Sequence, residues 1–253
     1  MLLYFLGTAG IGNAGDFLPV TGGSEWKFLS DYSDEFNGES LDLNKWNDSI
    51  KSWGLWTWRA RNVSVKNGAL RISMHYDEHL RDGIPIFYSS GIIQSRRPPL
   101  RYGYSEAKIR AASRDQGISP AFWAYRSENN KWTEIDFVEL TQHKMNPRVI
   151  DFNTHVFRHP DLSAKKPLRE QRSWIAPWSP SSDFHIYGCE WSPDEILWYV
   201  DGKLVARRVN EYWDQELVIT LSMGLRAPLI DHPEQRGFPT LMLVDYVRIW
   251  QRE

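Results

Sequence analysis

The chain has 253 residues, of which 25% are charged and 42% hydrophobic, a composition typical of folded globular proteins that excludes disordered and collagen-like classes. The net charge of −2 argues against a nucleic-acid partner, and no run approaches the ~18 apolar residues of a membrane span. Cys189 is the only cysteine, so an intrachain disulfide is excluded. We expect a soluble monomer.

The first 24 residues differ in composition from the rest. An apolar patch at positions 2–6 is followed by small residues, but the basic start of a secretory signal is missing. We predict an N-terminal extension or signal remnant over 1–24 and a single domain over 25–253, a length that suits one β-sandwich.

Past residue 25, short runs of β-branched and aromatic residues alternate with Gly, Pro, Asn and Asp, which is typical of strands and turns. The pairs Asn67-Gly68 and Asp201-Gly202 predict hairpins that join 62–65 to 69–73 and 196–200 to 203–206. Further strands are predicted at 91–95, 104–111, 121–125, 133–140, 151–157, 185–191, 217–223 and 241–250. Residues 159–183 are rich in proline and predict a long functional loop. The pattern indicates an all-β, two-sheet sandwich of the jelly-roll (concanavalin-like) type.

Three carboxylates interrupt the apolar strand predicted at 133–140. In a regular strand Glu134 and Asp136 share one face and Glu139 points to the other. A β-bulge near Phe137–Val138 would bring Glu139 to the same face. Such a row is costly in a structural strand because like charges repel and lose solvation. Paired carboxyl groups are, however, what retaining glycoside hydrolysis uses, one as nucleophile and one as proton donor.

Two structural explanations of these acids are weaker. A solvated edge strand would alternate more strictly, whereas Ile135, Phe137 and Val138 indicate packing on the opposite face. A metal site would draw more naturally on histidine or on loop oxygens.

The segment 132–140 resembles the Glu-x-Asp-x-x-Glu signature of glycoside hydrolase family 16 in its bulged form. The segments at 34–38, 102–106, 120–123, 184–188, 190–191, 199–202 and 244–250 are also similar to family patterns. The resemblance implies a concave sheet with an open substrate cleft, in which Glu134 is the nucleophile, Asp136 assists and Glu139 is the acid/base. It implies no cofactor for catalysis.

The same resemblance implies a structural calcium on the face opposite the cleft. By position, Glu35 and Asp245 are the candidate ligands, together with a backbone carbonyl near Gly68.

The substrate is less well determined. Glu139 is followed by Leu140, whereas members acting on 1,3-β-glucans have tyrosine there. This feature and the segments 153–158 and 222–228 look more like members that degrade red-algal galactans, the kappa-carrageenase and furcellaranase group. A sulfated galactan would suit a cleft with aromatic rings and arginines, and the chain has 20 Arg against 10 Lys. The candidate substrate-binding residues are Trp58, Arg59, Trp123, Arg126, Trp132, His155, Arg158 and Arg226.

We therefore expect a secreted or periplasmic retaining endo-β-glycosidase that acts on an anionic polysaccharide. His155 could instead be a satisfied core histidine. Two alternatives stay open: a family member with another substrate (a laminarinase, agarase or porphyranase) and a non-catalytic, lectin-like binding sandwich. A pure binding protein has no need of three acids in so costly an arrangement.

Overall fold

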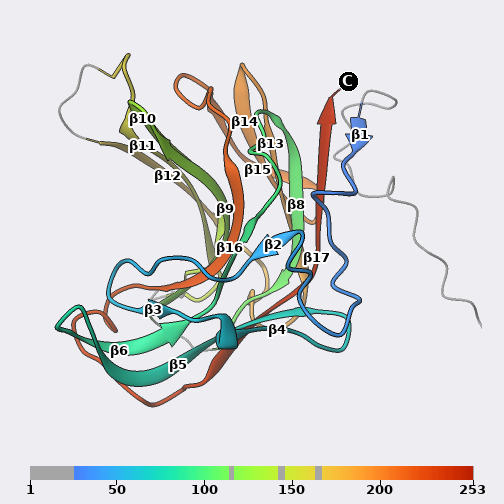
Figure 1. Ribbon diagram of the computed structural model, residues 1–253. Coiled ribbons are helices and arrows are strands. Elements are labelled where there is room, and N and C mark those ends of the chain that lie inside the picture. The colour runs from blue at the N-terminus through green and yellow to red at the C-terminus, as the bar shows by residue number, and fades with distance from the viewer. Residues whose placement is uncertain (1–25, 114–116, 142–145, 163–166, 253) are drawn as a thin grey trace, which may run out of the picture.

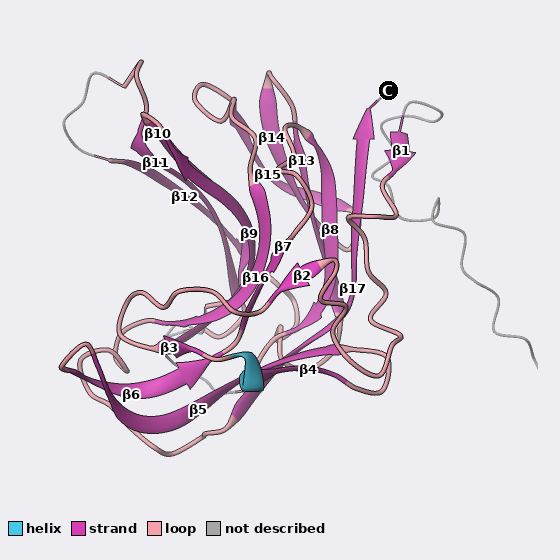
Figure 2. Ribbon diagram, viewed as in Figure 1, coloured by secondary structure: helices cyan, strands magenta, loops and turns pink. Residues whose placement is uncertain are grey.

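The computed structural model describes residues 26–113, 117–141, 146–162 and 167–252, which form two packed β-sheets (Figure 1). The predicted extension, 1–24, lies outside the described residues. Helical structure in the described ranges is limited to the 3-10 turn η2, Ala60–Asn62, and strands dominate (Figure 2). Within those ranges, no helix has the length and apolar character needed to cross a bilayer. The all-β prediction is confirmed.

The first sheet has ten strands in the order β15-β14-β13-β8-β17-β5-β6-β3, with β1 paired to β17 and β4 to β5. Its strands are β1 (Trp26–Phe28), β3 (Thr57–Trp58), β4 (Val63–Val65), β5 (Leu70–Arg81), β6 (Ile84–Ser90), β8 (Gly103–Arg110), β13 (His185–Trp191), β14 (Glu195–Val200), β15 (Lys203–Val209) and β17 (Thr240–Arg252).

The second sheet has seven strands in the order β12-β11-β10-β9-β16-β7-β2. They are β2 (Trp46–Asn47), β7 (Ile92–Ser95), β9 (Ile118–Glu128), β10 (Lys131–Glu139), β11 (Val149–Arg158), β12 (Leu168–Ile175) and β16 (Val218–Leu225). Every pairing within this sheet is antiparallel.

The hydrophobic core lies between the two sheets. Phe122, Ile135 and Phe152 from the seven-stranded sheet and Ile109 and Val247 from the other are fully buried in it. Because strand side chains alternate between faces, the residues between the buried ones on β9, β10 and β11 point to the outer face of the seven-stranded sheet. That face carries the acids.

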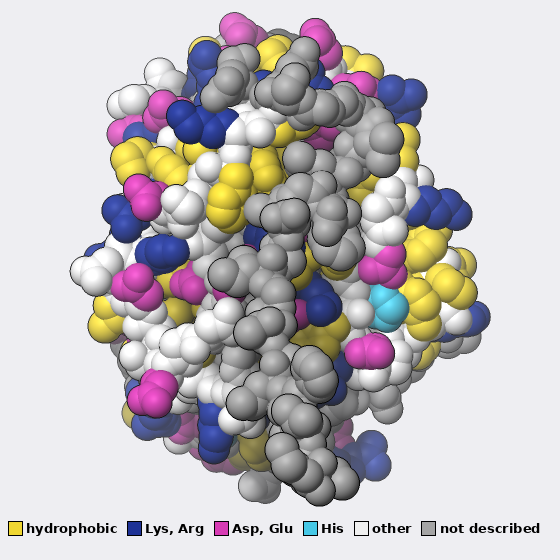
Figure 3. Space-filling model, turned by 90° about the vertical axis from the view of Figure 1, so that its right-hand side faces the viewer, with side chains coloured by type: hydrophobic (Ala, Val, Ile, Leu, Met, Phe, Trp, Pro, Cys, Tyr) yellow, Lys and Arg dark blue, Asp and Glu magenta, His cyan; other side chains and the backbone are white. Residues whose placement is uncertain are grey.

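Surface charge is mixed on the face that shows β1 and the end of the chain. Outside the grey residues of Figure 3, basic and acidic side chains are interspersed there.

Both predicted hairpins are present. Their turn residues Asn67, Gly68, Asp201 and Gly202 all have positive φ, between 48° and 75°, which is why the Asn-Gly and Asp-Gly pairs identified them. A third hairpin, between β5 and β6, was not predicted, although Asp82-Gly83 supplies the same turn signal and also has positive φ.

The prediction of a long loop over 159–183 is wrong in its central part. Residues Leu168–Ile175 form β12, which pairs with β11 over eight residues and is the edge strand of the seven-stranded sheet. Its residues alternate between half-buried and exposed, so its sequence lacks the buried apolar face by which strands are recognised.

The predicted bulge in β10 is confirmed. Asp136 and Val138 pair with the adjacent residues Trp123 and Phe122 of β9, so Phe137 is the extra residue. The indole Nε1 of Trp198, from the opposite sheet, donates a hydrogen bond of 3.0 Å to the backbone oxygen of Asp136. A bulge disrupts the ladder locally, and this bond from the other layer supports the chain at that point.

We expect Trp198→Phe to lower the free energy of unfolding by about 1–3 kcal/mol, because the Asp136 carbonyl loses its donor while buried. Urea unfolding measures the change. Trp250→Phe is the matched control, since this tryptophan is equally buried but lies in the separate cluster with Tyr104. Equal losses in the two variants would contradict a specific role for the Trp198 hydrogen bond.

Candidate active site

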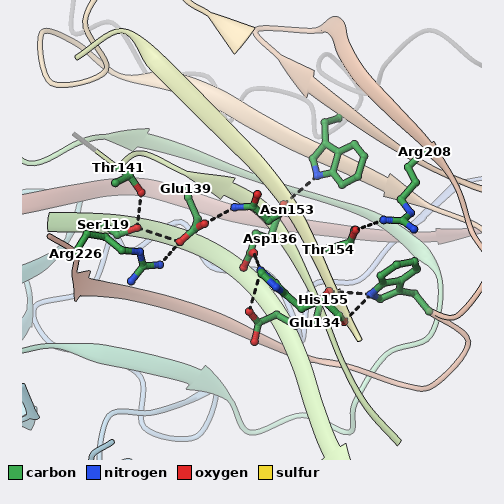
Figure 4. A network of polar contacts seen from close by, with 12 residues as sticks. Ser119, Glu134, Asp136, Glu139, Thr141, Asn153, Thr154, His155, Arg208 and Arg226 are labelled. Carbon is green, nitrogen blue, oxygen red and sulfur yellow. Dashed lines mark hydrogen bonds and ion pairs between the residues drawn. The ribbon is translucent and has the colours of Figure 1, made fainter. Parts of the chain in front are cut away.

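The three acids lie in a row along β10 and face one pocket on the outer side of the seven-stranded sheet (Figure 4). Glu134, Asp136 and Glu139 all line this pocket, so the bulge turns Glu139 to the side of the other two, as predicted. Their side chains are 18%, 6% and 13% exposed, respectively. Three carboxyl groups are thus withdrawn from water in one place.

Glu139 is held by partners from three other segments. Ser119 of β9 donates to its Oε1 at 3.1 Å, Asn153 of β11 donates to its Oε2, and Arg226 forms an ion pair with Oε1. Ser119 also contacts the Thr141 hydroxyl at 2.8 Å. Figure 4 shows Asn153 and Arg226 approaching the carboxyl group from different sides. This carboxyl group is therefore fixed in position.

His155 of β11 contacts the other two acids. Its Nε2 lies 3.1 Å from Asp136 Oδ2 and 3.7 Å from Glu134 Oε1. Burial lowers the pKa of His155, so the ring is neutral at neutral pH. His155 is not a core histidine with both ring nitrogens hydrogen-bonded, because its Nδ1 is buried without a partner in the described ranges.

Burial makes ionisation of the row unfavourable. It raises the pKa of Glu134 to about 8, helped by the negative charge of Asp136. The pKa of Asp136 is raised well above its ordinary range, first by burial and then by Glu139. The cluster therefore holds at least one proton at neutral pH. A cluster with one shared proton can supply both a charged and a neutral carboxyl group, as general acid catalysis requires.

Glu134, Asp136 and His155 also offer ligand atoms within 4.8 Å of one another, the only such group of three among the described residues. Its two acids and one half-buried histidine suit acid–base chemistry as they stand, and we assign no metal to it.

Aromatic rings also line the pocket. Trp53, Trp56 and Trp58 line it, with the Trp58 ring centroid 5.3 Å from each of the other two. Trp123 of β9 lines it from beside the acids and donates to Ser222 at 3.1 Å. Such walls suit sugar rings, whose apolar faces stack on indoles.

The structure brings together some of the predicted substrate-binding residues and separates others. Trp58, Trp123 and Arg226 line the pocket, and His155 contacts the acids. Arg59 pairs with Asp77, and Arg126 pairs with Glu128 and Glu216; neither lines the pocket.

Trp132 and Arg158 lie further along β10 and β11. They are register partners, with the guanidinium carbon 5.8 Å from the indole centroid. Trp132 is 36% exposed. They flank the pocket along the sheet rather than line it.

The candidate calcium ligands are engaged otherwise. Glu35 forms a two-bond ion pair with Arg248, at 2.8 and 3.0 Å, and Asp245 pairs with Lys108 at 2.6 Å. Gly68 lies beside Asn37. Carboxylates paired with basic side chains do not offer the free oxygen ligands that calcium needs, so these residues as they stand do not fit the predicted calcium site, and calcium binding by the protein stays an untested prediction.

Several site residues were missed from the sequence. Ser119, Asn153 and Ser222 contact the acids or the pocket wall, and Gly224 lines the pocket. Asn153 could have been found, because it lies two positions from His155 on a predicted strand and therefore shares its face. Ser119 and Ser222 depend on the register between distant strands.

Comparison with known proteins gives a family match over nearly the whole chain. The family model described as beta-porphyranase A–D, GH16 domain, matches residues 26–252. The kappa-carrageenase of Pseudoalteromonas carrageenovora is 35% identical over 90% of this chain, which spans 65% of that protein's length. Beta-porphyranase E of Zobellia galactanivorans is 30% identical over 72% of this chain and 68% of that protein.

Solved structures agree with this match. The kappa-carrageenase of P. carrageenovora in complex with an oligotetrasaccharide of kappa-carrageenan has a TM-score of 0.84 and 34% identity, covering 93% of this chain and 98% of that one. A kappa-carrageenase of Z. galactanivorans has a TM-score of 0.79 and 33% identity over 90% and 96% of the two chains.

We expect Glu134→Gln to stabilise the fold most at high pH. A carboxyl group whose pKa is raised from 4.5 to about 8 on folding stabilises the protein fully below pH 4.5, and this contribution is lost as pH rises through 8. The free energy of unfolding of the variant minus that of the parent should be about 1–3 kcal/mol larger at pH 8 than at pH 4.5. Urea unfolding at several pH values measures this.

The exposed Glu39 provides the control. Glu39→Gln should leave the pH dependence of stability unchanged, and a stability difference for Glu134→Gln that does not vary with pH would contradict the burial argument.

Proposed function

Because the chain belongs to glycoside hydrolase family 16, we propose that it cleaves internal β-linkages of a sulfated red-algal galactan, of the kappa-carrageenan or furcellaran type, with retention. The observation that carries this proposal is the row of Glu134, Asp136 and Glu139 facing one tryptophan-walled pocket. The non-catalytic, lectin-like alternative is not supported, because the chain is a glycoside hydrolase with all three acids in place.

Glu134 is the nucleophile in this proposal. Its carboxylate attacks the anomeric carbon, and Glu139 gives the leaving oxygen the proton that it receives from the cluster once its ion pair with Arg226 has opened. A covalent glycosyl-enzyme results. Glu139 then takes a proton from a water molecule, which attacks the anomeric carbon and releases Glu134. The contacts of Ser119 and Asn153 hold the Glu139 carboxyl in place, which suits a group that first protonates the leaving oxygen and then deprotonates the water that takes its place.

Asp136 assists by holding a proton. It is the most buried of the three acids and lies between the other two along β10. The raised pKa of Glu134 includes repulsion from an ionised Asp136, so a proton on Asp136 relieves that repulsion and favours the charged nucleophile. His155 orients Asp136 through its 3.1 Å contact.

The support for a sulfated galactan comes from relatives and from Arg226. Of three neighbours at 33–34% identity, two are kappa-carrageenases, and the third is named as a hydrolase of galactose-4-sulfate and 3,6-anhydrogalactose units. Arg226 brings a guanidinium into the pocket, a group that suits sulfate oxygens.

A porphyranase is the second candidate, because the matching family model is that of beta-porphyranases. The porphyranases among the curated relatives are 27–30% identical, lower than the kappa-carrageenase at 35%. A laminarinase activity is supported by a more distant relative, a glucan endo-1,3-beta-glucosidase that is 26% identical, and an agarase activity by the shared family alone.

The proposed site of action is outside the cytoplasm, because a galactan polymer is too large and too polar to cross a bilayer unaided. We also retain the expectation of a monomer.

Glu134→Gln should abolish turnover while leaving binding and fold intact, because the amide cannot attack the anomeric carbon but keeps its volume. Glu139→Gln should lower hydrolysis of the natural linkage by about 10²–10⁴-fold, and by much less for substrates with good leaving groups. Reducing-end release and polymer retention in affinity gels measure the two effects. Near-normal turnover in Glu134→Gln would rule out this nucleophile.

The substrate is tested by reducing-end release from kappa-carrageenan, furcellaran, porphyran, agarose and laminarin. We expect the highest kcat/KM on kappa-carrageenan or furcellaran, and at least about tenfold less after chemical desulfation, since one ion pair lost is worth about 1.4 kcal/mol. Preference for porphyran would favour the second candidate. Indifference to desulfation would overturn the sulfated substrate.

A further inference from the structure

Strand β12 carries an exposed arginine on the face that holds the acids. Glu134 pairs with His155 of β11, and His155 pairs with Arg169 of β12. Directly paired residues point to the same face of a sheet, so these three form a row across three strands. With neighbouring strands ~4.8 Å apart, Arg169 lies roughly 10 Å from Glu134 along the sheet.

Two hydrogen bonds confirm which face of β12 this is. Gln171 and Ser173 both donate to Asp151 Oδ1, at 2.8 and 2.6 Å. Asp151 is in turn the register partner of Glu139. The face with Arg169, Gln171 and Ser173 therefore continues the floor of the cleft beyond the pocket.

Aromatic rings lie beside this arginine. Its guanidinium carbon is 5.8 Å from the ring centroid of Phe157 on β11. The Phe157 centroid lies 4.5 Å from that of Trp132 on β10, and both rings are partly exposed. Three neighbouring strands thus present two rings and one guanidinium side by side.

Arg169 differs in its pairing from Arg172 and Arg208, whereas Arg158, which donates a hydrogen bond to Ser127, likewise forms no ion pair that involves a described carboxylate. Among the described residues, no carboxylate lies within ion-pair distance of Arg169. Arg172, on the opposite face of the same strand, and Arg208 of β15 both pair with Glu170. An exposed, unpaired guanidinium beside aromatic rings is suited to a ligand that combines an apolar ring face with an anionic group.

We propose that Trp132, Phe157 and Arg169 form a further sugar-binding subsite that recognises a sulfate ester of the polysaccharide. This inference rests on the proposed function. The rings stack on a sugar at a distance from the bond that is cleaved, and Arg169 pairs with its sulfate oxygens. The subsite contributes binding and selection of anionic chains, and takes no part in the chemical step.

The test compares Arg169→Gln with Arg172→Gln, a matched change on the opposite face of the same strand. On kappa-carrageenan, Arg169→Gln should raise KM about tenfold with kcat nearly unchanged, as expected for one lost guanidinium–sulfate pair. The difference should shrink at high salt, which screens an exposed pair, and vanish on the desulfated polymer. Arg172→Gln should behave as the parent in all three.

Circular dichroism and thermal unfolding check that both variants fold. Arg169→Lys keeps the charge, so it should raise KM less than Arg169→Gln does. Equal KM values for Arg169→Gln and Arg172→Gln on a cleaved sulfated polymer would overturn the subsite alone. A parent enzyme inactive on every sulfated polymer would instead overturn the proposed function.

Discussion

The active site depends on one extra residue in β10. Phe137 shifts the register so that Glu139 joins Glu134 and Asp136 on the outer face, while Ile135 and Val138 stay in the core. The hydrogen bond from Trp198 to the Asp136 carbonyl ties this irregularity to the opposite sheet. Trp213 adds a second tie, because its Nε1 donates to the backbone oxygens of Glu134 and His155, at 2.8 and 3.2 Å. The backbone beneath the acids is therefore held from the core side.

The cost of this arrangement is electrostatic. Three acids are withdrawn from water, and among the described residues only Arg226 contacts the row as a cation, at its Glu139 end. A neutral His155 gives Asp136 and Glu134 a polar contact without a compensating charge. The result is a cluster that retains a proton at neutral pH, which is a disadvantage for stability and a requirement for acid catalysis.

The sequence predicted what local patterns control. The acids were found from their spacing, the bulge from the parity of a strand, and two hairpins from Asn-Gly and Asp-Gly pairs. The β5–β6 hairpin was missed despite Asp82-Gly83. Strand β12 was missed because an edge strand with both faces partly exposed lacks the alternation of a buried face. The partners of Glu139 come from β9, β11 and the end of β16, and no local pattern reports such a register.

The pairing of Arg226 with Glu139 bears on how the cleft discriminates between small anions and polymers. A free inorganic ion that approached this guanidinium would have to displace the carboxylate and leave it buried with only its Ser119 and Asn153 contacts. A sugar chain brings hydroxyl groups and apolar ring faces to the same place, so it can replace what it disturbs. The guanidinium of Arg226 is thus shielded from dissolved salts of the group that the proposed substrate carries.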